Sequence, residues 1–194
     1  AMLGVLARCR RLLKPDARIC PSRITTWLAP SFLAPIFGEF SWWESPRYGI
    51  DFSAARDSAV NDTYNAQCPS PQLLCAAPAA FGEIHPTFPA PAADGVRQWT
   101  FDKEGPIDCV LGWFTAQLAD DHVLDTGPGS YTHWGQQLFP IPTILVAPGG
   151  TLHFHLQVTT GHRDLPTYRW SGRYVGPDGS EVRFERGQDR RFDV

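Results

Sequence analysis

The chain has 194 residues, of which 43% are hydrophobic and 12% aromatic, and this composition excludes an intrinsically disordered protein. Its formal net charge of −3 gives no electrostatic case for a nucleic-acid partner. No apolar run approaches the ~18 residues that a membrane-spanning helix needs, so we expect no membrane partner and, by elimination, a cytoplasmic location.

The placement of proline and glycine along the chain favours an all-β fold. Eighteen Pro and seventeen Gly occur in short stretches between apolar segments. The cysteines are odd in number and contain no CxxC pair, so we expect free and mostly buried thiols at Cys9, Cys20, Cys68, Cys75 and Cys109.

The first element is predicted to be a short helix. Apolar residues from Met2 to Leu13 recur at helical spacing with arginines on the other face, and Lys14-Pro15 ends the pattern. Residues 17–28 are predicted to be extended, because Ile24 to Trp27 are β-branched and aromatic.

A second helix is predicted after an irregular, Pro-rich and aromatic-rich stretch at 29–48. Residues 52–64 carry a modest apolar stripe, with Asp51 or Ser53 as the N-cap. Residues 67–78 read as a connector.

From Phe81 onward the sequence predicts strands at intervals of about ten residues, which indicates a sandwich or a barrel. Apolar and polar residues alternate with a period of two. The expected strands cover 96–101, a long and central 107–118, 143–147, 152–159, 168–174 and 181–186, with turns at Asp120-Asp121, Pro148-Gly149-Gly150 and Pro177-Asp178-Gly179.

The stretch 112–140 is the most informative part of the chain. It predicts a strand, a turn, a short strand, a loop and another strand, and the loop contains Thr126-Gly127 and then Thr132-His133-Trp134. Loops on a rigid scaffold are frequent places for function.

This segment resembles the C-terminal barrel domain of protein arginine methyltransferases, whose signature is a Thr-His-Trp loop. Two further strings support the resemblance. The string at 10–22 (RRLLKPDARICPS) is similar to the helix, turn and strand that close a class I methyltransferase domain, with Asp16-Ala17 in place of the usual glycine pair. Tyr48-Gly49-Ile50-Asp51 is similar to the string that precedes an inserted helical arm.

The resemblance implies a mostly β fold, a β-barrel with a short N-terminal helix and an inserted helical arm. Residues 1–17 would close a methyltransferase domain missing from this chain, residues 18–194 would form the barrel, and an arm at about 50–78 would form a homodimer. The chain has no GxGxG motif followed about 20 positions later by an acidic residue, and it lacks the family's double-glutamate loop. S-adenosylmethionine would therefore bind only to the missing domain, and we expect no cofactor or metal here and no activity from this chain alone.

The resemblance also assigns site residues. His133 would be an accessory catalytic residue at the mouth of the substrate-arginine pocket, where a guanidinium loses a proton as it takes a methyl group. Thr132, Trp134 and Tyr131 would contact a protein or peptide substrate. The carboxylate partner of His133 would come from outside the chain, and a purely structural role for this histidine stays open.

Three other interpretations stay open. His153 and His155 lie on one side of a predicted strand and, with His162, could bind a metal in a cupin-like enzyme, although the expected glutamate is missing. The many Trp and Tyr residues could serve a carbohydrate- or peptide-binding sandwich. Ser130, His133 and Asp125 could form a Ser-His-Asp catalytic triad, but the sequence around Ser130 lacks the nucleophile-elbow motif that would support one.

Overall fold

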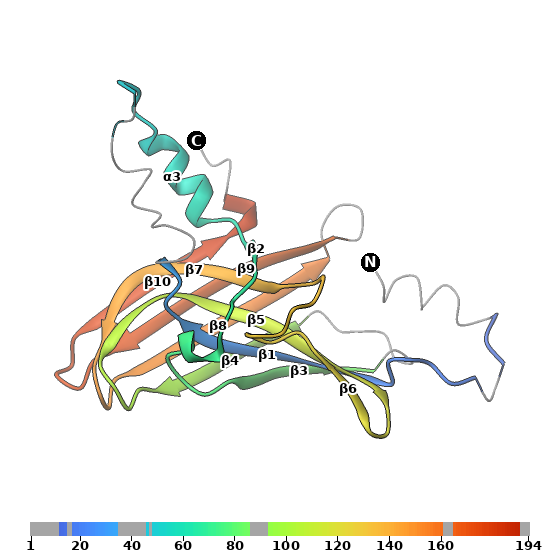
Figure 1. Ribbon diagram of the computed structural model, residues 1–194. Helices are drawn as coiled ribbons and strands as arrows, with labels where there is room; N and C mark the ends of the chain where they lie inside the picture. The colour runs from blue at the N-terminus through green and yellow to red at the C-terminus, as the bar shows by residue number, and fades with distance from the viewer. Residues whose placement is uncertain are drawn as a thin grey trace.

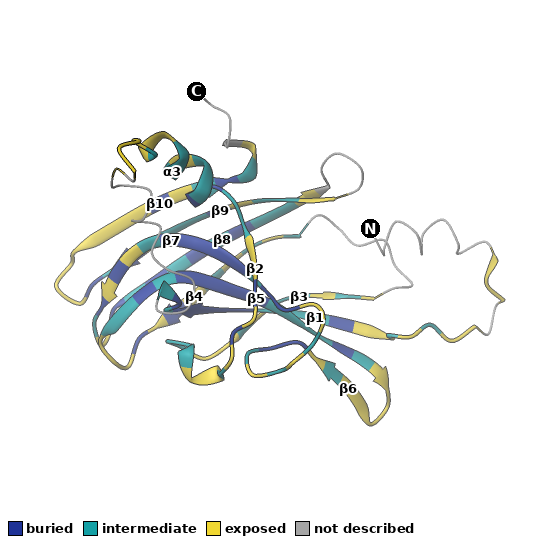
Figure 2. Cartoon of the chain, turned by 45° about the horizontal axis from the view of Figure 1, so that its top comes forward, coloured by how far each residue is buried: buried dark blue, intermediate teal, exposed yellow. Residues whose placement is uncertain are grey.

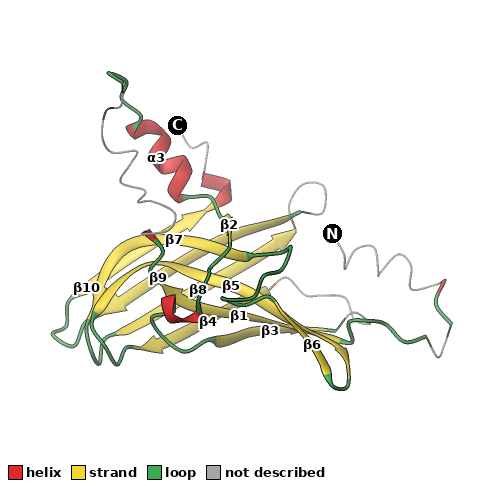
Figure 3. Cartoon of the chain, in the orientation of Figure 1, coloured by secondary structure: helices red, strands yellow, loops and turns green. Residues whose placement is uncertain are grey.

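The computed structural model describes residues 12–14, 17–34, 46, 48–85, 93–160 and 165–190. Strands make up most of this part of the chain (Figure 3). The elements are β1 (Arg23–Ser31), α3 (Ser53–Val60), β2 (Tyr64–Ala66), η3 (Pro71–Leu73), β3 (Ala79–Ile84), β4 (Ala93–Thr100), β5 (Gly105–Ala119), β6 (His122–Asp125), β7 (Gln136–Val146), β8 (Thr151–Thr160), β9 (Pro166–Val175), β10 (Glu181–Gly187) and η5 (Gln188–Arg190). The predicted helix at Met2 to Leu13 falls almost entirely outside the described residues, as does His162.

Two antiparallel sheets pack against each other into a barrel-like body (Figure 1). The first sheet has the order β2-β7-β5-β1-β3, with β6 paired to β5, and the second has the order β10-β9-β8-β4. The predicted fold class, a mostly β barrel that carries a helical arm, is confirmed.

The long strand β5 is central, as predicted. It pairs with β1, β7 and β6, and its two faces serve two apolar clusters. Val110 belongs to the main core between the sheets, whereas its neighbour Leu111 belongs to a smaller cluster on the other face. The strand is apolar on both faces because both faces are covered.

The main core confirms the alternation predicted for β8. Leu152 and Phe154 are fully buried, while His153 and His155 are only partly buried on the opposite face. Trp170 of β9 is also buried, and its indole donates a hydrogen bond of 2.7 Å to the Pro140 carbonyl across the two sheets. Figure 2 shows these buried segments running along the strands between the sheets.

One predicted turn has a different role. Pro148-Gly149-Gly150 was expected to form a hairpin, but β7 and β8 lie in different sheets, so the turn carries the chain between layers. Within the turn, the Gly150 N–H donates to the Ala147 carbonyl at 2.9 Å. The turn is also tied to Phe101: the Gly149 N–H donates to the Phe101 carbonyl at 2.8 Å, and the Phe101 N–H donates to the Gly150 carbonyl at 3.0 Å.

The helical arm is present at Ser53–Val60 and stands away from the sheets (Figure 1). Its N-cap is Phe52, and neither Asp51 nor Ser53 is the cap, which corrects the prediction. The helix begins at Ser53, one residue too early for Ser53 to be its cap. The Asp51 carboxylate accepts a hydrogen bond of 2.8 Å from the Ser53 N–H, so it pairs one of the free N–H groups of the first turn from the residue before the cap.

The base of the arm is fixed to the far end of the chain. The Asn61 carboxamide accepts a hydrogen bond of 3.1 Å from the Gly187 N–H and donates one of 2.8 Å to the Asp57 carbonyl. The Gln188 amide donates to Asp62 at 3.0 Å and to Thr63 at 3.2 Å. The arm therefore leaves the barrel in a defined direction.

The described cysteines are free thiols: Cys68 and Cys109 are buried, Cys75 is half-buried, and Cys20 is exposed. Cys9 lies outside the described residues. No helix in the described ranges is long and apolar enough to cross a membrane.

Candidate functional site

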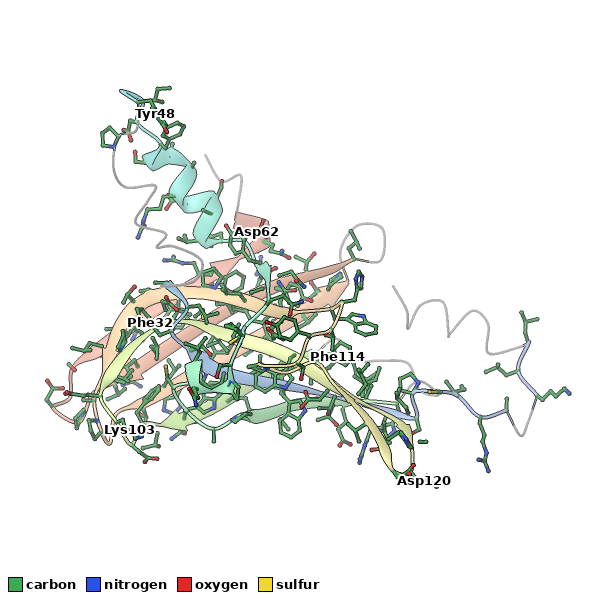
Figure 4. The ribbon with its side chains drawn as sticks, in the orientation of Figure 1. Phe32, Tyr48, Asp62, Lys103, Phe114 and Asp120 are labelled. Atoms are coloured by element: carbon green, nitrogen blue, oxygen red, sulfur yellow. The ribbon has the colours of Figure 1, made fainter. Side chains whose placement is uncertain are left out.

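The loop that contains Thr132-His133-Trp134 joins β6 to β7, as predicted, and we call residues 126–135 the THW loop. It lies at the end of the barrel from which the β5–β6 hairpin projects. Figure 4 labels Phe114 beside this loop and Asp120 at the hairpin tip, with Lys103 at the opposite end of the barrel.

The loop begins at a residue with no exposed surface. The Thr126 N–H donates to the Phe114 carbonyl at 3.1 Å, and the Phe114 N–H donates to the Thr126 hydroxyl, also at 3.1 Å. The Asp125 carboxylate then accepts the Gly127 N–H at 2.7 Å. These bonds hold the entry to the loop against β5.

The loop ends at Gln136, which is fully buried. Its Nε2 donates to the carbonyls of Thr126 at 2.7 Å and Gly127 at 3.2 Å, and its Oε1 accepts the Cys68 N–H at 2.6 Å. One amide therefore joins both ends of the loop to the segment after β2. Buried polar groups that are fully paired make a structure rigid and specific.

The middle of the loop is held by two amides near β2. The Asn65 side chain donates to the Trp134 carbonyl at 2.5 Å, and the Gln67 side chain donates to the Thr132 carbonyl at 2.9 Å. Gly135 permits this approach, because its φ is +60° and a Cβ there would lie 2.5 Å from Asn65 Oδ1. The left-handed conformation and the contact both require glycine.

Three side chains of the loop, Tyr131, His133 and Trp134, are exposed on this fixed backbone, whereas the Thr132 hydroxyl oxygen is buried and makes no hydrogen bond within the described residues. Tyr131 is 91% exposed, Trp134 is 51% exposed, and His133 is also exposed, whereas Thr132 is half-buried. The His133 and Trp134 rings make an edge contact with centroids 6.1 Å apart, and Trp134 makes another with Phe114 at 5.8 Å. The four predicted site residues therefore sit together on one rigid loop with accessible aromatic surface.

The competing sites have different arrangements. Asp125, the acid of the possible triad, accepts the Gly127 N–H instead of holding an imidazole. His155 Nε2 lies 2.5 Å from Asp94 Oδ1 on the neighbouring strand β4, and this hydrogen bond lowers the pKa of Asp94. Within the described ranges, no three His, Cys, Asp or Glu side chains come close enough together to hold a metal ion.

Sequence reasoning missed the residues that fix the loop. The sequence analysis gave no role to Gln136 or to Asn65, which lies between the predicted helix and the connector, and it placed Gln67 in the connector. Their carboxamides pair with residues nine to 69 positions away, a relationship that periodicity does not encode.

Structural comparison decides the fold. The chain superposes with a TM-score of 0.79 on the PRMT1 enzyme–prozyme heterotetrameric complex of Trypanosoma brucei, solved with AdoHcy, at 14% identity over 96% of this chain and 64% of that chain. With protein arginine methyltransferase 10 of Arabidopsis thaliana the TM-score is 0.74, at 18% identity and the same coverage of 96% and 64%. The chain has the fold of the C-terminal β-barrel domain of protein arginine methyltransferases.

Sequence comparison agrees over shorter stretches. The chain is 44% identical over 39 residues to human protein arginine N-methyltransferase 9, and 36% identical over 55 residues to the Xenopus laevis protein of that name. These matches cover 20% and 26% of this chain, but only 5% and 7% of the relatives. No protein-family model matches the chain.

Proposed function

We propose that the chain is the substrate-cleft and dimerisation barrel of an S-adenosylmethionine-dependent arginine methyltransferase-like protein. A methyltransferase domain on its N-terminal side supplies the methyl donor and the catalytic carboxylates. The observation that carries this proposal is the THW loop, a rigid backbone presenting His133 and Trp134 to solvent at one end of a barrel with the fold of these enzymes.

In this proposal His133 assists proton removal. A guanidinium nitrogen of the substrate attacks the methyl carbon, the carbon–sulfur bond breaks with its electrons going to sulfur, and the nitrogen gives up one proton. His133 is exposed and can face a carboxylate brought by the methyltransferase domain, and an imidazole between the two can orient or relay this proton.

The aromatic neighbours of His133 form the wall of the substrate cleft. Trp134 keeps half of its surface exposed although it packs edge-on against Phe114, so its indole has a fixed position and an open side. Tyr131 extends further out, where it can contact a peptide that carries the arginine. Aromatic surface with a fixed orientation is typical of binding sites.

The arm is proposed to form the dimer. It stands off the barrel with Tyr48 98% exposed and Ile50 55% exposed, and Figure 4 labels Tyr48 at its outer end. Isolated apolar side chains at the end of a fixed projection suit docking on a second copy. Ile50→Asp should therefore convert a dimer to a monomer in analytical ultracentrifugation of the full-length protein. Leu145→Asp, at a site on β7 that is 75% exposed, is the control and should leave the dimer intact.

The methyltransferase role is tested with the full-length protein, an arginine peptide and methyl-labelled S-adenosylmethionine. His133→Ala should lower kcat by about tenfold to a hundredfold, because a proton-transfer group is lost. His122→Ala removes another exposed histidine, which lies 2.6 Å from Asp121 on the hairpin, and should leave kcat unchanged. Equal activity of the His133→Ala variant and the wild type would remove the catalytic role of this residue, and absence of methyl transfer by the wild type to any arginine substrate would refute the proposal.

A further inference from the structure

A cavity of about 550 Å³ opens between the two sheets at the end of the barrel next to the THW loop. Its walls come from several strands of the first sheet, and from Ala93 and Asp94 of β4, Leu156 and Val158 of β8 and Tyr168 of β9 in the second. We propose that this cavity binds a quaternary ammonium cation, such as a trimethylammonium group. The cavity shares Trp134 with the proposed substrate cleft but lies between the two sheets, and methyl transfer to a guanidinium does not imply a quaternary ammonium ligand.

Aromatic rings line the cavity from both sheets. Phe139 and Tyr168 meet edge to face across the sheets with centroids 5.4 Å apart, and Phe114 and Trp134 do so at 5.8 Å beside the loop. Phe114 and Tyr168 are only half-buried, so part of each ring is not covered by other side chains. Ring faces that border an open space attract cations through their quadrupole.

Phe81 shows this interaction within the molecule. The Arg97 Cζ atom lies 5.4 Å from the centroid of the Phe81 ring, so one ring of the cavity wall already pairs with a guanidinium. The same Arg97 side chain donates to the Phe81 carbonyl at 2.7 Å, which fixes the geometry of the pair.

The charges at the rim favour a cation over an anion. Glu83 of β3 and Asp94 of β4 border the cavity where the edges of the two sheets approach each other, and no Lys or Arg is among the described lining residues. An aspartate is ionised at neutral pH, and the hydrogen bond with His155 lowers the pKa of Asp94 further. Glu83 lies 3.8 Å from Arg23 and 3.7 Å from His85, both in exposed pairs that water screens.

The size of the cavity agrees with a small ligand. Pockets for small molecules enclose roughly 300–1,000 Å³ and combine apolar walls with a few polar groups. Besides Glu83 and Asp94, the polar lining includes the Asn65 and Gln137 carboxamides, which already donate to the Trp134 and Tyr64 carbonyls. It also includes the Thr26 hydroxyl, which donates to the Gly82 carbonyl at 3.1 Å. A compact cation with methyl groups can occupy the aromatic space without leaving a buried donor unpaired, because a quaternary ammonium has no N–H.

The experiment compares choline with 3,3-dimethylbutan-1-ol, which has the same shape and no charge. Each is titrated into the protein by isothermal calorimetry. Choline should bind at least about tenfold more tightly than the neutral analogue, because only the cation gains from the rings and the rim. Equal affinities would overturn the proposal in favour of a purely apolar site, and no heat from choline up to high millimolar concentration would overturn it outright.

Variants locate the binding. Phe114→Leu and Glu83→Gln should each weaken choline binding by about threefold or more, with little effect of Glu83→Gln on the neutral analogue. Tyr131→Ala removes an exposed aromatic residue of the same loop that does not line the cavity, and should bind choline like the wild type. Glu83 is exposed, so Glu83→Gln tests the charge even if Phe114→Leu fails to fold.

The assay measures binding only, so its failure leaves the methyltransferase proposal untouched.

Discussion

The backbone N–H of Cys68 donates a hydrogen bond of 2.6 Å to Gln136 Oε1, deep in the molecule and 68 residues away along the chain. The other end of the same carboxamide donates to the carbonyls of Thr126 and Gly127. Since water cannot reach Gln136, no solvent molecule can replace these partners if the amide is removed.

Gln136→Leu should therefore lower the free energy of unfolding by roughly 2–4 kcal/mol, because each buried group left without a partner costs about 1–3 kcal/mol. Urea denaturation measures the loss. Gln137→Leu, at a half-buried neighbour whose amide makes one hydrogen bond of 3.1 Å to the Tyr64 carbonyl, should cost about 1 kcal/mol or less. Equal losses for the two variants would show that Gln136 does not have this special role.

Two glycines separate backbone strain from steric contact. Gly135→Ala should lower stability by about 1–2 kcal/mol for its φ of +60° and by a further 1–3 kcal/mol because its Cβ would meet Asn65 and the Ala66 carbonyl, 2.7 Å away. Gly179→Ala has a similar φ of +82° and nothing within 4 Å, so it should show the first loss alone. Thermal unfolding of both variants gives the difference, and a smaller loss at Gly135 would contradict the tight fit of the loop on β2.

The thiols should differ in reactivity. Burial raises the pKa of Cys75 to about 11, so at pH 8 only about one molecule in a thousand carries the thiolate. Burial also raises the pKa of Cys68 and Cys109, whereas Cys20 is exposed. In a Cys9→Ser variant, Ellman's reagent should modify one thiol rapidly in the native protein and the other three only after urea is added. Fast modification of two or more thiols would contradict this arrangement.

The β9–β10 hairpin should lose stability in acid. Hydrogen bonds from Arg183 and Arg173 hold the pKa of Glu181 below its ordinary value, and the Arg173 pair has an N–O distance of 2.8 Å. Because the folded-state pKa is lowered, the contribution is present above the ordinary glutamate pKa of about 4.3 and disappears as the pH falls through the lowered value. The stability difference between the wild type and Glu181→Gln should therefore be positive at pH 6 and vanish near pH 2. A difference that persists at pH 2 would mean that the carboxylate charge is not its source.

The arm should loosen without the Asn61 carboxamide. Asn61→Ala removes the hydrogen bonds to Gly187 and Asp57, and the loss of about 1 kcal/mol of local stability should speed amide exchange in α3 by about fivefold. Hydrogen–deuterium exchange with mass spectrometry measures the effect, and the amides of β8 provide an internal control that should not change. Uniform acceleration across both elements would indicate global destabilisation instead.

Local pattern predicted most of the strands and the arm. The alternation from Leu152 to Thr159 and the two apolar faces of β5 are direct consequences of which faces are covered, so periodicity was sufficient there. The sequence predicted a strand after the THW loop and another at 143–147, whereas the structure has one strand, β7, which runs through Pro140 and Pro142. Because β2 pairs only with Gln136–Leu138, the edge of β7 beyond Leu138 carries no ladder in the described part of the chain, and a missing N–H there costs little.

The candidate site divides in the same way. The THW loop and its position between two strands could be predicted from the loop's own residues, because turn-forming and aromatic residues are features of the local sequence. Its supports were not readable, since Asn65, Gln67 and Cys68 reach the loop only once β2 has paired with β7. The role of Pro148-Gly149-Gly150 was also misjudged, because the same three residues fit a hairpin and a crossing between layers.

The hydrogen bonds of Gln188 bear on the order in which the parts of the molecule can assemble during synthesis. Its side chain meets the Tyr168 N–H at 3.1 Å as well as Asp62 and Thr63, and the arm residues that it and Gly187 hold lie 125 or 126 positions earlier in the chain. A ribosome would release the arm long before it synthesises the residues that orient it. The nascent arm therefore lacks these contacts until Gly187 and Gln188 have been synthesised, and a protease cut just before Gly187 would remove them again.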